Sequence, residues 1–266
     1  MIVLLASLFV SPAQASAYYF TDIGVRGFSR AGANVVGAND MTALWYNPAA
    51  LSNLERGQVM LDVAGVGHKV VFDRADEDGQ PPFDPVENQA PLYAIPHFGV
   101  AHRLGTPDTV FAFGFYPPYA PDYSYDSAGA QRYTLNDTLV IQTSLGPTVA
   151  HEFADWFTVG VGVAWNILIA QQELATNLDS PLDDEDQYDP AYDVDFSLEA
   201  TDRKGFSWNV GFKIEPPSGR WAVGGMFQPP VAFDAKGSMS ADFNGNVFYE
   251  TDDPFYGGLI EDPIAV

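Results

Sequence analysis

The sequence predicts an all-β protein, an antiparallel β-barrel that spans a membrane. Three observations predict this fold class. Long segments alternate large apolar residues with small or polar ones, tight and long connections follow one another in strict order, and the N-terminus resembles an export signal. Of the 266 residues, 47% are hydrophobic and 14% aromatic, which is too apolar a composition for a disordered chain.

The charge of the chain excludes several classes of protein. The 35 acidic residues outnumber the 12 basic ones, so a nucleic-acid partner, which requires a basic face, is not expected. The absence of cysteine excludes disulfides, thiolate nucleophiles and iron–sulfur clusters. Nearly all of the net charge lies in three stretches, 73–90, 173–202 and 242–262. We interpret these stretches as solvated connections.

Residues 1–17 are predicted to be a signal peptide. An apolar run ends in small residues at Ala13-Gln-Ala15 or Ala15-Ser-Ala17, the spacing of a cleavage site. The run is too short to cross a bilayer as a helix, which needs about twenty apolar residues. Because of this signal peptide, the protein is expected to be exported. The alternative is that these residues form a buried N-terminal strand or helix.

Period-two alternation predicts the strands. From Phe157 to Ile169 large apolar residues occupy the odd positions, while Thr, Gly, Ala and Asn fill the even ones, with Leu168 as the exception. The same pattern recurs between Gly205 and Ile214. It fits a lipid-facing barrel strand and a half-buried soluble strand equally well. We expect seven strands, at residues 58–72, 92–103, 109–118, 137–151, 156–171, 204–214 and 220–232.

The connections distinguish these two readings. Tight turns are expected at 105–108, 152–155 and 215–219. Long connections are expected at 73–91, 119–136, 172–203 and from 233 onward. Short turns at one end and long loops at the other are typical of outer-membrane barrels, whereas a secreted β-sandwich would vary its loops without this order. The acidic run 183–186 could attract divalent cations, but it lacks EF-hand spacing and no metal site is predicted.

The segment before the first strand carries the most specific pattern. It reads Gly27-Phe-Ser-Arg30-Ala-Gly32, then reaches Asp40, and ends in Asn47-Pro48-Ala49. This pattern resembles the N-terminal hatch of FadL-type outer-membrane transporters of long-chain fatty acids and aromatic hydrocarbons (OmpP1/FadL/TodX-like). Further similarity lies at residues 102–105, 154–156, 205–212 and 221–230, so the resemblance covers nearly the whole mature chain.

The resemblance implies a division of the chain into a hatch at 18–57 and a barrel part at 58–266. The family has fourteen strands, an even number as single-chain barrels require, so we expect about half a barrel and an N-terminal fragment. The hatch would lie inside the lumen, since residues 24–50 have too little bulky apolar surface for a core of their own. The implied hatch and gating residues are Gly27, Arg30, Gly32, Asp40, Asn47, Pro48 and Ala49.

The resemblance also implies passive uptake of a hydrophobic ligand. The ligand would dock between the connections 172–203 and 233 onward, enter a pocket above the hatch, and leave through a lateral opening at the third strand. Residues of that opening would be Phe115, Tyr116, Pro117 and Pro118, where proline cannot donate a ladder hydrogen bond. Acidic loops repel carboxylates, which favours an uncharged hydrocarbon.

The expected partners are a hydrophobic small molecule and the lipid and lipopolysaccharide of the bacterial outer membrane, with a monomer as the full-length state. No cofactor, metal or catalytic residue is expected, and the protein is not predicted to be an enzyme. Ser29 lacks the G-x-S-x-G context because Ala31 replaces a glycine, and the four histidines are dispersed. The alternatives are a structural or adhesive surface barrel without transport and a secreted soluble β-sandwich binding protein.

Overall fold

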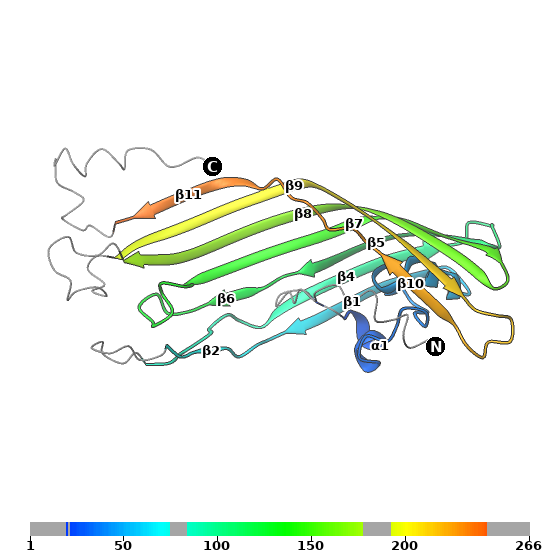
Figure 1. Cartoon of the computed structure of the whole chain (residues 1–266), viewed down its shortest axis with the longest axis horizontal. Helices are drawn as coiled ribbons and strands as arrows, with labels where there is room; N and C mark the ends of the chain where they lie inside the picture. The colour runs from blue at the N-terminus through cyan, green and yellow to red at the C-terminus, as the bar shows by residue number, and fades with distance from the viewer. Residues whose placement is uncertain (1–19, 21, 75–83, 178–192, 244–266) are drawn as a thin grey trace, which may run out of the picture.

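The computed structural model describes residues 20, 22–74, 84–177 and 193–243. The predicted signal peptide and the acidic run 183–186 lie outside these residues. Figure 1 shows long strands side by side in one curved sheet, with the N-terminal helices near the end that carries the tight turns. In the described residues no helix is long and apolar enough to cross a membrane.

The main sheet is antiparallel throughout and follows the order β1-β4-β5-β7-β8-β9-β10, with β6 on β7 and β11 on β9. Successive strands of this path are neighbours, as in an up-and-down barrel wall. Its strands are β1 (Gln58–Val66), β4 (Tyr93–His102), β5 (Thr109–Tyr119), β6 (Asp122–Ser124), β7 (Asp137–Ala154), β8 (Phe157–Asn177), β9 (Asp193–Ile214), β10 (Val223–Phe227) and β11 (Lys236–Asp242). A separate pair joins β2 (Val71–Phe72) to β3 (Val86–Glu87).

The alternation predicted from the sequence is confirmed. Thr158 and Ala164 on β8 are buried on the inner face, whereas the outward Val161 and Trp165 are 48% and 56% exposed. Outward aromatic residues gather near the tight turns, where Trp156 and Trp221 are about half exposed. The sheet therefore presents a large apolar outer face and an inner face of small and polar residues, as a lipid-embedded barrel wall requires.

Several predicted strand limits were wrong. The described parts of the expected loop 172–203 are strand, because β8 continues to Asn177 and β9 begins at Asp193, with one register from Leu168 opposite Asp202 to Asn177 opposite Asp193. Many of these residues have polar side chains, but their backbones still pair. The alternation of apolar residues, from which the strands were predicted, gives no sign of this pairing. The predicted strand 58–72 divides into β1 and β2, and 220–232 shrinks to β10. Strand β11 and the short β3 and β6 were missed, and all three lie within expected long connections.

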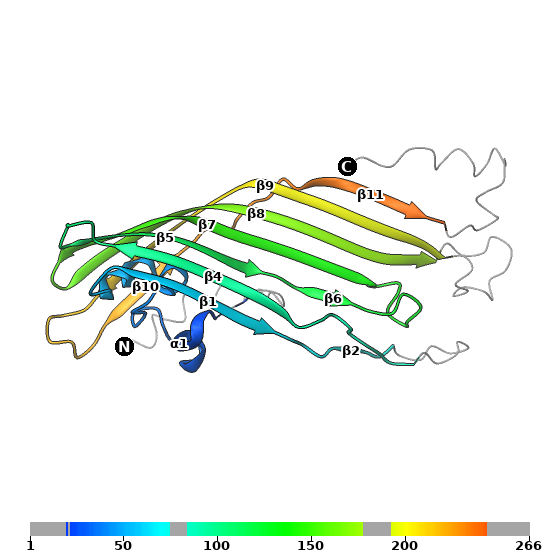
Figure 2. The same ribbon diagram turned by 180° about the vertical axis from the view of Figure 1, so that it is seen from behind.

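The N-terminal segment, residues 20 and 22–54, forms α1 (Gly24–Ser29), α2 (Ala43–Tyr46) and the 3-10 helix η2 (Pro48–Asn53). Figure 2 shows these helices from behind, still at the tight-turn end. Met41, Leu44 and Leu51 are buried against small inner residues of the sheet such as Ala112 and Ala150. Short side chains on the strands thus leave space that the segment fills.

Candidate functional site: the N-terminal segment and the cavity beside it

Asn47 joins the N-terminal segment to the sheet. Its side chain is fully buried, and its Oδ1 accepts a hydrogen bond from the Ala49 N–H at 3.0 Å, which caps η2. Its Nδ2 donates to the carbonyl of Phe212 on β9 at 3.0 Å. Pro48 occupies the first turn of η2, where a missing N–H has no cost. One amide therefore both starts the helix and anchors it to the wall.

Glycines on three neighbouring strands make room for this turn. A Cβ at Gly160 on β8 would collide with the backbone of Pro48 and Ala49, and one at Gly211 on β9 with the Asn47 side chain. At Gly224 on β10 a Cβ would lie 2.6 Å from Val36 Cγ1. The small residues of the alternating strands therefore provide a surface on which the segment sits in backbone contact.

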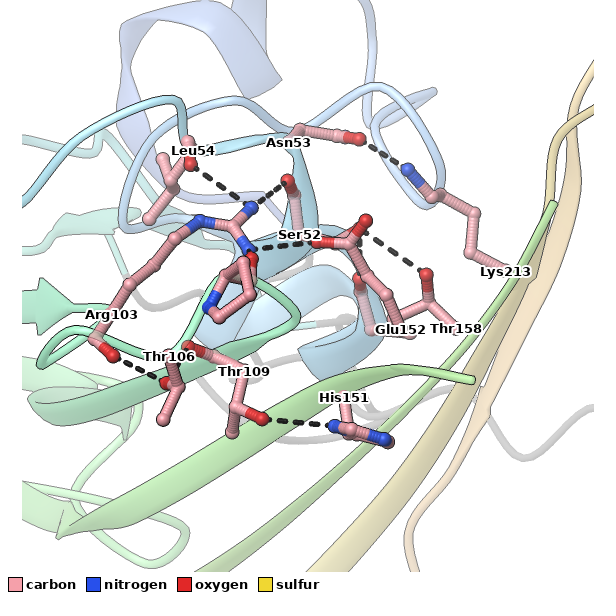
Figure 3. A network of polar contacts seen from close by, with 12 residues as sticks. Ser52, Asn53, Leu54, Arg103, Thr106, Thr109, His151, Glu152, Thr158 and Lys213 are labelled. Carbon is pink, nitrogen blue, oxygen red and sulfur yellow. Dashed lines mark hydrogen bonds and ion pairs between the residues drawn. The ribbon is translucent and has the colours of Figure 1, made fainter. Parts of the chain in front are cut away.

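Polar contacts fix the end of η2 near the tight turns (Figure 3). Arg103, just after β4, pairs with Glu152 of β7 through Nη1 and Oε1 at 2.9 Å. Its Nη2 donates to the carbonyl oxygens of Ser52 at 3.0 Å and Leu54 at 3.4 Å. Arg103 thus satisfies carbonyl groups at the C-terminal end of η2, which the helix leaves without partners.

A buried lysine provides the second anchor. Lys213 of β9 donates through Nζ to Asn53 Oδ1 (Figure 3). Its Nζ also contacts Glu215 Oε2 at 3.1 Å. Asn53 in turn donates through Nδ2 to the carbonyls of Val36 at 3.0 Å and Ala38 at 2.7 Å. Lys213, on the inner face of the wall, is therefore connected through Asn53 of η2 to the loop that contains Val36 and Ala38.

Four further predicted residues hold the N-terminal segment together internally. Arg30 Nη1 donates to Asn34 Oδ1 at 2.8 Å and to the Gly37 carbonyl at 3.2 Å. Asp40 Oδ1 accepts from the Thr42 N–H at 3.0 Å. Gly32 has a φ of +78°, which favours glycine. Gly27 lies beneath the Tyr46 hydroxyl, where a Cβ would collide with it.

An apolar cavity of about 250 Å³ lies between the N-terminal segment and strands β1 and β4. Two acids and one histidine are its ionisable lining residues, and the Nδ1 atom of His97 lies 3.6 Å from Oδ2 of Asp62. His97 is 4% exposed. The lining residues are Phe20, Asp22, Ile23, Gly24, Val25, Phe28, Asp62, Val63, Ala64, Gly65, Val66, Ile95 and His97.

Aromatic contacts link this cavity to β5. Ile23 lines the cavity and belongs to the same buried cluster as Trp45, against which Tyr116 packs. The rings of Trp45 and Tyr116 meet edge to face, with centroids 5.3 Å apart. The Phe20 N–H donates to the carbonyl of Pro118 at 3.1 Å. The N-terminal segment therefore contacts β5 on both sides of Pro117.

The predicted opening at β5 coincides with an irregularity of the sheet. Pairing with β7 is regular up to Tyr116 and resumes at Tyr119, so the two intervening prolines interrupt the ladder. On the other side, pairing with β4 extends from His102 only to Phe98, opposite Phe115. Strand β5 continues to Tyr119, one residue beyond the predicted end.

A buried ion pair lies at the opposite end of the strands. Arg132 Nε contacts Asp193 Oδ2 at 3.0 Å, and both side chains are less than 10% exposed. Tyr133 donates its hydroxyl proton to Asp193 Oδ1 at 2.9 Å. Burial raises the pKa of the Tyr133 phenol, and the hydrogen bond to Asp193 raises it further. These contacts fasten the connection between β6 and β7 to the start of β9.

Sequence reasoning grouped Gly27, Arg30, Gly32, Asp40 and the Asn47–Ala49 turn, and the structure brings all of them into one packed segment. It missed Arg103, Lys213 and His97 as partners of that segment or its cavity. For Lys213 a signal existed, because it falls on the polar side of an alternating strand. Arg103 lies in the stretch 102–105 that resembles the family, but nothing there indicates its contacts, and for His97 the sequence pattern gives no signal.

The fold and the site define an outer-membrane β-barrel wall with an N-terminal segment packed on its inner face. The sequence profile described as "Outer membrane protein transport protein (OMPP1/FadL/TodX)" matches residues 6–252, and the chain belongs to this family. The predicted family, fold class and outer-membrane location are thereby confirmed. No curated protein matches the sequence.

Solved structures support the fold. A FadL homologue of Pseudomonas aeruginosa aligns with a TM-score of 0.65 and 15% identity over 88% of this chain and 57% of its own. The toluene transporter TodX of Pseudomonas putida gives 0.56 and 16% over 85% and 60%. The toluene transporter TbuX of Ralstonia pickettii gives 0.55 and 14% over 78% and 61%. The chain thus spans about three fifths of the length of these structures.

Proposed function

We propose that the chain forms part of an outer-membrane transporter for passive uptake of small uncharged hydrophobic molecules. In this proposal residues 18–57 are a hatch that stays docked in the lumen. The observation that carries the proposal is the apolar cavity of about 250 Å³ between the hatch and the wall. An apolar concave site with few polar groups suits a hydrophobic ligand.

The cavity lining favours an uncharged ligand. Asp22 and Asp62 line it, and no lysine or arginine is among its lining residues in the part of the chain that the structure describes. A carboxylate would therefore meet like charge without a compensating lysine or arginine. Two of the similar solved structures are toluene transporters by name, and we propose a single-ring aromatic hydrocarbon such as toluene as the ligand.

The contacts of the hatch support a lateral exit at β5. Ile23 at the cavity and Trp45 beside it pack in one cluster with Tyr116, next to the interrupted ladder. A ligand that displaces Ile23 as it passes would also displace Trp45 and Tyr116, because the three side chains pack together. The anchors at Arg103, Lys213 and Asn47 favour an exit through the wall, because a passage through the hatch would break all three.

The test is uptake of radiolabelled toluene by cells that lack their own transporter and produce the full-length protein. Ala64→Phe fills the cavity and should lower the protein-dependent uptake several-fold. Val59→Phe, on the outward face of the same strand and outside the cavity, is the matched control and should leave uptake unchanged. Equal uptake with and without the protein would contradict transport and favour a structural or adhesive surface barrel.

A further inference from the structure

Strands β10 and β11 both pair with β9, and they do so in the same register. Pairing of β10 ends at Phe227 opposite Val210, and pairing of β11 begins at Lys236 opposite Thr201. Residues 202–209 of β9 therefore face residues 228–235 over equal lengths, yet no ladder pair joins them. We call this interval the β9 gap. It is an interruption within one strand pairing, since the register is the same on both sides.

The residues around the β9 gap explain why the ladder can separate there. Pro229 and Pro230 have no N–H to donate, so fewer donors are left without partners. Asp202 Oδ2 accepts from the Asp234 N–H at 2.7 Å, and Oδ1 accepts from the Lys204 N–H at 2.7 Å. The Trp165 indole donates to the Arg203 carbonyl. At the end of the β9 gap near Asp202, bonds to side chains thus take the place of several ladder bonds.

The inner side of the β9 gap is polar, and one aromatic ring lies against it. Ser207 and Asn209 of β9 are buried there, and Asn209 Oδ1 has no hydrogen-bond partner. Phe233 lies against Gly205, so that a Cβ at Gly205 would be 2.7 Å from Phe233 Cε1. Glycine at this position therefore lets the Phe233 ring lie flush with the wall.

The outer side is aromatic and exposed. Phe206 is 63% exposed, and Trp208 is 42% exposed with its ring centroid 5.8 Å from that of Phe227. In lipid, backbone polar groups without partners are strongly disfavoured, so a permanent break in a wall strand must be filled by protein, water or a ligand. An aromatic rim outside and a polar floor inside give the β9 gap two different surfaces.

The β9 gap and the break in β5 lie on one row across the sheet. Tyr116 pairs with Ser144, Ser144 with Asn166, and Asn166 with Gly205. The β8–β9 register also shifts just beyond Asn166, which gives β9 a bulge. Ser144 donates to Asn166 Oδ1 at 2.6 Å, and Asn166 Nδ2 donates to Ser207 at 2.9 Å. The two irregular sites therefore share a level and a continuous polar strip.

We propose that the β9 gap is a second side opening of the wall, through which a small aromatic hydrocarbon leaves the lumen, with Phe233 as the side chain that closes it. The inference rests on the proposed transport function. A single-ring ligand can displace Phe233 and exchange its ring contacts for those of Phe206, Trp208 and Phe227. The flanking pairs of β10 and β11 hold the strand in register while the interval opens.

The 266 residues contain no cysteine, so introduced thiols are the only ones in this part of the protein. In the full-length protein, the pair Ser207→Cys and Pro230→Cys places two thiols across the β9 gap. The register of the flanking pairs puts these two positions opposite each other. Ser197→Cys with Ser240→Cys places them across the paired part of β9 and β11 as the matched control. Both are joined with the same short bismaleimide, the product is verified by peptide mass spectrometry, and toluene uptake is compared before and after.

Cross-linking of the β9 gap should lower uptake in part, because the proposed exit at β5 stays open, while the control cross-link should leave uptake unchanged. Phe233→Ala, which removes the closing ring without a cross-linker, should raise uptake. Unchanged uptake in the cross-linked gap variant, or in Phe233→Ala, would overturn the second opening. These results are read only against uptake by the unmodified protein. Absence of that uptake would refute the transport proposal itself.

Discussion

Gly211 of β9 lies so close to Asn47 that any side chain at position 211 would collide with the Asn47 amide. The same amide bonds to the carbonyl of Phe212, the next residue of the strand. Contact by shape and contact by hydrogen bond therefore occur at one point, between residues far apart in the sequence. This point fixes where the N-terminal segment lies on the wall and, with it, where the cavity forms.

Gly211→Ala should detach this contact. The added methyl must displace Asn47 or bend β9, and overpacking of this kind costs about 1–3 kcal/mol. Gly65→Ala on β1 is the matched control, because a Cβ there meets nothing within 4 Å. Urea unfolding in detergent micelles, followed by tryptophan fluorescence, measures the difference. Equal midpoints for the two variants would contradict the close packing.

Asn47→Asp separates the two roles of the amide. The carboxylate can still accept from the Ala49 N–H, but it cannot donate to the Phe212 carbonyl, so this part-buried acceptor loses the Asn47 donor. The expected loss is about 1–3 kcal/mol of unfolding free energy. Asn39→Asp, on an exposed part of the segment, should change little. The urea midpoint again provides the measurement, and a stability equal to the parent would show that the Phe212 bond contributes nothing.

The carboxylate partner and the carbonyl partners of Arg103 should contribute unequally. Glu152→Gln leaves Arg103 bonded to the carbonyls of Ser52 and Leu54, so the cost should stay below about 1 kcal/mol, as for partly exposed pairs. Arg103→Ala also leaves those carbonyls without a donor and should cost about 1–3 kcal/mol. A double-mutant cycle with urea unfolding separates the terms. Equal effects of the two single variants would argue against the carbonyl contacts.

Tyr133 should make stability sensitive to alkaline pH. Because its pKa is raised in the folded protein, mainly by burial, the unfolded chain loses the phenolic proton first. The contribution of Tyr133 is therefore intact below the ordinary tyrosine pKa of about 10 and is lost as the pH rises through its folded value. Tyr133→Phe should flatten the urea midpoint against pH above about pH 10. An unchanged slope would contradict the role of burial.

Much of the wall could be predicted from the sequence. Strand β8 and the lower part of β9 were found because each alternating residue reports directly which face it occupies. The Asn47-Pro48 turn was also found, because its chemistry is local. The upper part of β9, from Asp193 to about Arg203, was missed, since its polar side chains surround a backbone that still pairs with β8. The periodicity of the sequence indicates the environment of the side chains, but it does not show which backbone groups form hydrogen bonds.

The sequence by itself determined the strand alternation, the order of tight and long connections, and the small residues on the inner face. The tertiary structure decided which inner residues hold the N-terminal segment. Arg103 reaches Ser52 across 51 positions, and Lys213 reaches Asn53 across 160. It also decided where the wall is interrupted, because the β9 gap exists only in the pairing of two strands. Such contacts depend on where the folded chain brings distant residues, and no local pattern records them.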